Sequence, residues 1–149
     1  MNIYFAGPLF TLGERSFNRS LRDALVALGH KVFLPQDSEV NSRAVFDPKE
    51  VAKDDQRAVY AADVLIANLD GPMVDDGTAL EVGMAIDKGK ITVGYRTDFR
   101  TCGDDPNIHV NLMFNLMDMV ILYSGSDIDE LAQKIHGAMM AIDHDRKNF

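Results

Sequence analysis

The chain has 149 residues, 46% of them hydrophobic and 26% charged, with a formal net charge of -8. This length suits one compact domain, so we predict a single domain over residues 1–149. The acidic balance argues against nucleic-acid binding, because a protein that neutralises phosphates needs a basic face. No apolar run approaches the roughly 20 residues of a membrane-spanning helix, so we expect no membrane partner. The single cysteine excludes an intrachain disulfide and nothing at the N-terminus resembles a signal peptide, so we predict a cytoplasmic protein.

Strand-like and helix-like segments alternate along the chain. Short apolar runs that end at turn-forming residues are typical of strands, whereas apolar residues three or four positions apart are typical of helices. In chain order we expect strand 2–6, helix 14–28, strand 31–35, helix 48–62, strand 63–69, helix 77–88, strand 91–95, strand 119–123 and helix 127–145. Gly29 is expected as a C-cap and Asp127 as an N-cap. The alternation predicts an α/β fold, a doubly wound, flavodoxin-like domain whose parallel five-stranded sheet is flanked by helices.

Ligands of such sheets bind outside the carboxyl ends of the strands. This rule points to the segments that follow the predicted strands: Gly7 to Phe10, Gln36 onward, Asp70 to Asp76, and Arg96 onward. We expect 36–47 to be a loop over the site and 96–110 to be a second long loop. Acidic side chains gather near this rim, at Asp55, Asp75, Asp76 and Glu81.

Glu81 is the one acidic residue in the otherwise uncharged run from Ala79 to Ile86. One interpretation is a capping box, in which Asp76 or Thr78 caps the helix and Glu81 folds back onto a backbone N–H. The other is a functional carboxylate, because apolar neighbours leave this helix little face for solvent and a buried charge is costly unless it is paired. We also expect the positive end of the helix dipole to keep Glu81 ionised. Both interpretations stay open at this point.

Several carboxyl groups around one apolar cleft suit chemistry at an anomeric carbon. There one carboxylate attacks while a carboxylic acid protonates the leaving group. A Mg²⁺ site made by the same four carboxylates is the competing interpretation, but no phosphate-cradling glycine-rich loop with a lysine accompanies them. We therefore predict neither a metal nor another cofactor. Surface positions are expected for the four histidines, His30, His109, His136 and His144.

Four segments carry a more specific signal. They are IYFAGPLF (3–10), Asp55 placed eight residues before Asp63 of ADVLIANLDG, DDGTALEVGMA (75–85), and VNLM (110–113). The third segment is similar to the pattern D-x-G-x-x-x-E-x-G. Together, in this order and spacing, they resemble the nucleoside 2-deoxyribosyltransferase family over nearly the whole chain.

The resemblance implies an enzyme that transfers the 2-deoxyribosyl group between nucleobases by cleaving the N-glycosidic bond of 2′-deoxynucleosides. Glu81 is then the nucleophile that forms a covalent glycosyl-enzyme, and Tyr4 holds it through its hydroxyl. Asp55, or Asp75, handles protons on the departing and incoming base.

The resemblance also implies a set of substrate contacts and partners. Asp75 and a partner chain's Asn111 bind the sugar's 5′-hydroxyl, and Phe10 packs against the base. The other implied substrate-binding positions are Phe5, Gly7, Gln36, Gly77 and Met113. The partners are a nucleoside, a free nucleobase and further copies of the chain, in a homodimer or higher homo-oligomer whose interface includes the methionines of 111–119.

Two alternatives remain. The first is a hydrolase that cleaves the N-glycosidic bond of nucleosides or their 5′-monophosphates. Asp75 would repel a phosphate, unless Arg15, Arg19 or Arg96 points inward and offsets its charge. The second is a non-catalytic nucleotide-binding domain that uses the same scaffold.

Overall fold

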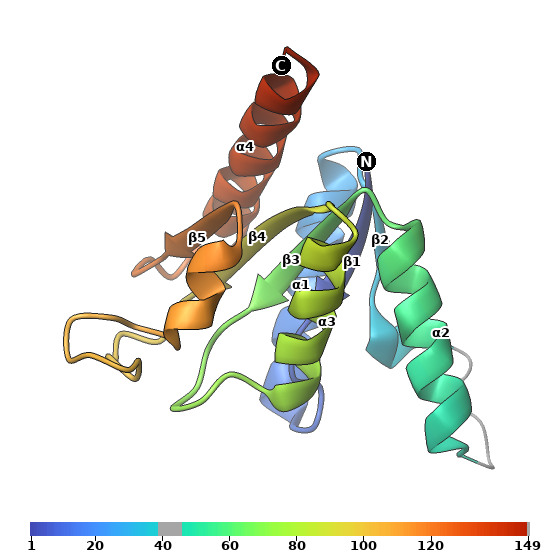
Figure 1. Cartoon of the computed structure of the whole chain (residues 1–149), viewed down its shortest axis with the longest axis horizontal. Helices are drawn as coiled ribbons and strands as arrows, with labels where there is room; N and C mark the ends of the chain where they lie inside the picture. Colours follow the sequence, from blue (N-terminus) through green and yellow to red (C-terminus); the bar gives the residue numbers. More distant parts are fainter. Residues whose placement is uncertain (39–45, 149) are drawn as a thin grey trace.

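The computed structural model describes residues 1–38 and 46–148. Within these residues, five strands form one parallel sheet in the order β2-β1-β3-β4-β5, with helices on both faces (Figure 1). The elements are β1 (Asn2–Ala6), α1 (Leu12–Ala27), β2 (Lys31–Phe33), the 3₁₀ helix η1 (Pro35–Asp37), α2 (Pro48–Ala61), β3 (Val64–Asn68), α3 (Asp76–Asp87), β4 (Ile91–Arg96), the 3₁₀ helix η2 (Leu112–Leu116), β5 (Met119–Leu122) and α4 (Ile128–Lys147). This strand order is that of flavodoxin-like sheets, so the predicted doubly wound α/β fold is confirmed.

The sheet separates two hydrophobic cores. α1 and α4 pack together on one face, and α2 and α3 pack together on the other. Because side chains alternate along a strand, Ile3 and Phe5 of β1 enter the core under α1 and α4, whereas Tyr4 and Ala6 enter the core under α2 and α3. The central strand β3 is buried along its whole length, as its continuous apolar run predicted.

The connection from β4 to β5 differs from the prediction. We expected no element there, but the chain forms η2, and Phe114 and Met117 pack into the core under α2 and α3. η2 thus covers part of the sheet face beside α3. The loop predicted over 36–47 begins as η1, and its residues 39–45 lie outside the described part of the chain.

Helix ends explain most of the boundary differences. α1 begins at Leu12, two residues earlier than predicted, because Thr11 and Glu14 form a capping box: Glu14 N donates to Thr11 Oγ1 at 3.2 Å and Thr11 N donates to Glu14 Oε2 at 2.7 Å. Gly29 follows the helix with a φ of 89°, as expected of a C-cap glycine, and Asp127 caps α4. β2 ends at Phe33 rather than at Pro35, which opens η1 instead.

One histidine prediction was wrong. His30 is only 6% exposed, and its Nε2 lies 2.9 Å from Nδ1 of His136 on α4. The two rings therefore connect the residue before β2 to α4, near the amino ends of the strands. Among the described residues, no helix is long and apolar enough to cross a membrane.

Candidate active site

Tyr4 and Glu81 meet under α2 and α3. Tyr4 is fully buried in the middle of β1, and its hydroxyl donates a hydrogen bond of 2.6 Å to Glu81 Oε1 in the second turn of α3. Asp55, half-buried on α2, faces the same space and interacts electrostatically with both groups. Two of the predicted catalytic residues are therefore in contact, and a third lies beside them.

Asp75 caps α3. Its Oδ2 accepts hydrogen bonds from Thr78 N at 2.9 Å and Thr78 Oγ1 at 3.0 Å. The helix thus begins at Asp76, before Thr78, and the predicted capping box of Thr78 and Glu81 does not form. Gly77 keeps this cap possible, since a Cβ there would lie 3.2 Å from Asp75 Oδ2. Freed from a capping role, the Glu81 carboxyl points toward the sheet and Tyr4.

α3 is buried along one side rather than all round, which corrects our expectation. Thr78, Val82 and Ala85 are buried, whereas Leu80 is 62% exposed and Gly83 also faces outward. The apolar composition of this helix therefore serves two surfaces, one against the sheet and one that faces out.

The surroundings of Glu81 raise its pKa to about 7. Burial is the main cause, and the negative charges of Asp55 and Asp75 add to it, while the hydrogen bond from Tyr4 acts in the opposite direction. Burial also raises the pKa of Asp55. The expectation that the helix dipole keeps Glu81 ionised was therefore wrong, because desolvation dominates in the second turn.

The turn after β1 is held by two side chains of α1 to which the sequence analysis did not assign this role. Asn18 Nδ2 donates to Pro8 O at 2.9 Å, and Arg15 Nη1 donates to Phe10 O at 2.7 Å. Gly7 fits closely against Asn68 of β3, since a Cβ would lie 3.1 Å from the Asn68 Cβ. Phe10 stands 70% exposed above this turn.

The structure does not bring two predicted substrate contacts to the site as free groups. Phe5 is fully buried on the opposite sheet face, edge-on to Tyr95, so the prediction that its side chain contacts a ligand is corrected. Gln36 uses both ends of its amide within the protein: its Nε2 donates to Arg15 O at 2.9 Å, and its Oε1 accepts from Asn18 Nδ2 at 3.1 Å.

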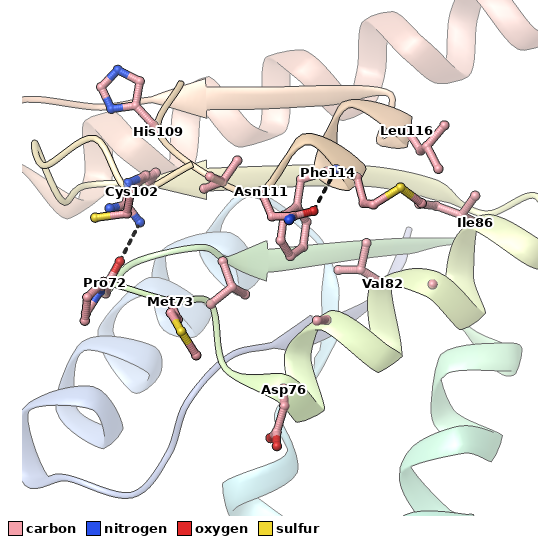
Figure 2. Close-up of a pocket in the computed structure, with 17 residues that line it drawn as sticks. Pro72, Met73, Asp76, Val82, Ile86, Cys102, His109, Asn111, Phe114 and Leu116 are labelled. Carbon is pink, nitrogen blue, oxygen red and sulfur yellow. Dashed lines mark hydrogen bonds between the residues drawn. The ribbon is translucent and has the colours of Figure 1, made fainter. Parts of the chain in front are cut away.

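Asn111 and Met113 lie on the other side of α3. They line a cavity of about 580 Å³ between α3 and the segment from Cys102 to Leu116, which we call the α3–η2 cavity (Figure 2). Its α3 side includes Ala79 and Gly83, each two residues from Glu81, and residues two apart point to opposite sides of a helix. Asn111 of one chain therefore does not reach the Glu81 carboxyl of that chain.

Arg96, which the sequence analysis considered only as a charge near a phosphate, has a structural role that it missed. It is buried at the end of β4, and its guanidinium donates to Gly71 O at 3.0 Å and Arg100 O at 3.0 Å, and also to Leu69 O. These bonds fix the backbone that leads from β3 to Asp75. An arginine at the end of an otherwise apolar strand is the signal that could have revealed it.

No group of three or more His, Cys, Asp or Glu side chains is placed to hold a metal ion in the parts of the chain that the structure describes. Asp75 faces Thr78, and Glu81 faces Tyr4. In these contacts the two carboxyls act as separate hydrogen-bonding groups.

The sequence profile of the family described as nucleoside 2-deoxyribosyltransferase matches residues 3–113, which is more than half of the chain and includes Tyr4, Asp55, Asp75 and Glu81. The chain belongs to this family. The resemblance inferred from the four segments is thereby confirmed. Membership of the family indicates an enzyme of nucleoside deoxyribosyl transfer or N-glycosidic cleavage.

Solved structures agree with the fold. A conserved protein from Enterococcus faecalis V583 is 32% identical over 91% of this chain and 97% of its own, with a TM-score of 0.73. The 2-deoxyribosyltransferase from Bacillus psychrosaccharolyticus is 22% identical over 89% of this chain and 90% of its own, with a TM-score of 0.69. The CMP N-glycosidase BcmB from Clostridium botulinum is 22% identical over 91% of this chain and 98% of its own, with a TM-score of 0.63. No curated protein matches the chain.

Proposed function

We propose that this protein transfers the 2-deoxyribosyl group between nucleobases, through a covalent glycosyl-enzyme on Glu81. The main support is the Glu81 carboxyl itself, which is partly buried, bonded to the Tyr4 hydroxyl and flanked by Asp55. A carboxyl fixed in this way by a donor is pre-organised to attack a carbon that develops positive charge. The Tyr4 bond favours the ionised form, which is the form that attacks.

The reaction then proceeds in two balanced steps. An oxygen of Glu81 attacks C1′ as the bond between C1′ and the base nitrogen breaks, the bonding electrons leave with the base, and Asp55 gives the base a proton. A nitrogen of the acceptor base next attacks C1′ and returns a proton to Asp55, and the ester bond to Glu81 breaks. Burial raises the pKa of Asp55, which suits a group that must carry this proton.

Charge favours a nucleoside over a nucleoside 5′-monophosphate. Asp75 and Asp76 place two carboxylates at the start of α3, where they would repel a phosphate dianion. The arginines that could offset them are engaged, since Arg15 and Arg96 donate to backbone carbonyls and Arg19 pairs with Asp37. We therefore propose 2′-deoxynucleosides as the substrate class.

The decisive experiment mixes the protein with deoxyinosine and either adenine or cytosine and separates the products by chromatography. Formation of a new deoxynucleoside only when acceptor base is present supports transfer. Free 2-deoxyribose without exchange identifies a nucleoside hydrolase, and sugar phosphate from deoxynucleoside monophosphates identifies the monophosphate hydrolase. Glu81→Gln is the matched control, because it keeps the size of the side chain and removes the carboxylate.

A non-catalytic nucleotide-binding domain makes the opposite prediction. It gives no product from any of these mixtures, and Glu81→Gln leaves ligand binding intact. The transferase instead forms an adduct of one sugar unit on the peptide that contains Glu81. A slow 2-fluoro substrate lets this adduct accumulate, and mass spectrometry detects the fluorinated sugar after the reaction is quenched with acid. Absence of the adduct under single-turnover conditions contradicts covalent catalysis.

We further propose that the active unit is at least a homodimer, in which Asn111 completes a neighbour's site. The face around the α3–η2 cavity exposes Met73, Leu80, Met113 and Leu116, and an apolar surface of this kind suits the docking of a second copy. Asn111 lies on the other side of α3 from Glu81 of the same chain, which agrees with a role in the site of another chain.

Mixing inactive variants tests this assembly. Glu81→Gln and Asn111→Ala are each expected to lose most activity, whereas an equal mixture recovers about a quarter of the wild-type rate, because half of randomly paired C₂ dimers contain one intact site. Sedimentation must show a dimer or a larger oligomer for the wild type and a smaller species for Leu116→Lys. A monomeric, fully active wild type contradicts the proposal.

A further inference from the structure

We propose that Phe33 is a positioning residue for the site, because its ring stacks on Tyr4 and fixes the direction in which the Tyr4 hydroxyl donates its hydrogen bond to Glu81. The catalytic part of this inference rests on the proposed function. The positioning part does not, since it concerns the contact between Tyr4 and Glu81 in the free protein.

The stack follows from strand register. Tyr4 and Phe33 are paired residues of the neighbouring parallel strands β1 and β2, so their side chains leave the sheet on the same face. Their ring centroids are 5.5 Å apart, with 16° between the ring planes. On the other side of Tyr4, its partner in β3 is the buried Leu65. The Tyr4 ring is therefore held in a row between an aromatic ring and an aliphatic side chain.

Phe33 is the outer member of this row. β2 is an edge strand of only three residues, and Phe33 borders a surface crevice with Ala58 of α2 and with Ala62, which follows that helix. Leu65, the inner neighbour of Tyr4, is buried in the core, whereas Phe33, which stacks on its outer side, is half-buried. Phe33 carries no group that donates or accepts a proton, so any effect on the reaction passes through Tyr4.

The orientation of the Tyr4 side chain matters because its hydroxyl makes a short hydrogen bond to Glu81, the carboxyl that we propose reacts. A swing of the Tyr4 side chain about its Cα–Cβ bond moves the hydroxyl, at the far end of the side chain, away from its 2.6 Å contact with Glu81 Oε1. That bond favours the ionised carboxylate against the effect of burial. A looser Tyr4 is therefore expected to leave Glu81 harder to ionise and a poorer nucleophile.

The test is a double-variant cycle on the titration of Glu81, followed by NMR of the side-chain carboxyl in protein labelled with ¹³C-glutamate. Phe33→Leu keeps apolar cover but removes the ring stack, and it is expected to raise the Glu81 titration midpoint by about half a unit to one unit, as Tyr4→Phe does. In the Tyr4→Phe background, Phe33→Leu is expected to add nothing. An unchanged midpoint in Phe33→Leu, or an equal further shift in the double variant, overturns the proposal.

Two controls separate positioning from general loss of packing. Phe33→Tyr keeps the stacked ring and is expected to restore the wild-type midpoint. Phe17→Leu removes a half-buried ring from the other core, where Phe17 packs near Tyr95, and is expected to leave Glu81 unchanged. A shift in Phe17→Leu as large as that in Phe33→Leu contradicts a specific role.

Kinetics provide the second readout. In the exchange assay, Phe33→Leu is expected to lower kcat several-fold with little change in KM, and to move the acidic limb of the pH profile upward by the same amount as the NMR midpoint. An unchanged kcat together with a shifted midpoint overturns the catalytic part alone. If the wild type exchanges no base, the proposed function fails while the titration cycle still decides the positioning of Tyr4.

Discussion

At the residue scale, the site depends on the Glu81 carboxyl, whose surroundings disfavour its ionised form. Glu81 has a pKa of about 7 because burial and two nearby carboxyls outweigh the hydrogen bond from Tyr4. Interacting carboxyls with displaced pKa values commonly divide the roles of acid and nucleophile. The same displacement makes both the activity and the stability of the protein depend on pH in predictable directions.

The first prediction concerns the pH dependence of exchange. Since only ionised Glu81 attacks, kcat/KM is expected to rise by up to about tenfold per pH unit below 7, and the need for a protonated Asp55 limits the rise at higher pH. Tyr4→Phe removes the bond that favours the carboxylate, so it is expected to lower activity and move this limb upward. Tyr123→Phe also deletes a bonded hydroxyl, one that donates to Asp127 O, and must leave the limb in place. A flat profile between pH 5 and 8 contradicts the assignment.

The second prediction concerns stability. The unfolded chain ionises Glu81 near its usual pKa of 4.5 and the folded chain only near 7, so the folded state loses stability as pH rises between these values. Glu81→Gln removes this loss and is expected to raise the free energy of unfolding at pH 8 by on the order of 3 kcal/mol, with little change at pH 4.5. Urea unfolding at the two pH values measures the difference. Equal effects of the substitution at both pH values would show that burial does not raise the pKa of Glu81.

At the element scale, two helices with the same spacing of residues begin in different ways. Thr11 and Glu14 form a capping box at α1, whereas Thr78 and Glu81, also three residues apart, do not, because Asp75 caps α3 one turn earlier. Asp75 thus sets where α3 starts and therefore which turn carries Glu81. The local hydrogen bonds of this cap therefore help to determine the position of Glu81 in the site.

The third prediction separates the capping and electrostatic roles of Asp75. Asp75→Ala loses the bonds to Thr78 and is expected to cost about 1 kcal/mol of stability, whereas Asp75→Asn still caps the helix and is expected to cost little. Both substitutions remove a negative charge near Glu81, so both are expected to lower its titration midpoint. Urea unfolding and NMR titration check the two effects. Thr11→Ala at α1 is the control for loss of a cap alone, and it must leave Glu81 unchanged.

At the scale of the whole molecule, β1 and β3 lie at the centre of the sheet, and the chain leaves them toward opposite faces. α1 follows β1 on one face and α3 follows β3 on the other, so the turn from Gly7 to Phe10 and the segment from Asp70 to Asp75 meet at the carboxyl edge. The opposite edge holds no predicted site residue, but it carries the His30 and His136 pair that ties α4 to the sheet. The two ends of the sheet thus respond differently to pH.

The fourth prediction uses that histidine pair. Burial, the amino group of Met1 and His136 all lower the pKa of His30 in the fold. The unfolded chain therefore binds this proton more readily, and the stability contributed by neutral His30 is lost as pH falls below its unfolded value of roughly 6.5. Melting temperatures at pH 7 and 5 are expected to fall less in His30→Gln than in the wild type. Because Glu81 acts in the opposite direction over this range and is present in both proteins, only the difference between them reports His30. Parallel melting curves would contradict the prediction.

Sequence by itself determined the fold class, nearly all of the element order, several helix caps and the identity of the acidic residues at the rim, because periodicity, turn residues and caps act over a few positions. Only the tertiary structure decided that Tyr4 bonds Glu81 across 77 positions of sequence, that Phe33 stacks on Tyr4, and that Phe5 faces the other core. The pKa of Glu81 likewise depends on burial by distant segments. Strand register and desolvation are properties of packed neighbours, and those neighbours are brought together only when the whole sheet forms.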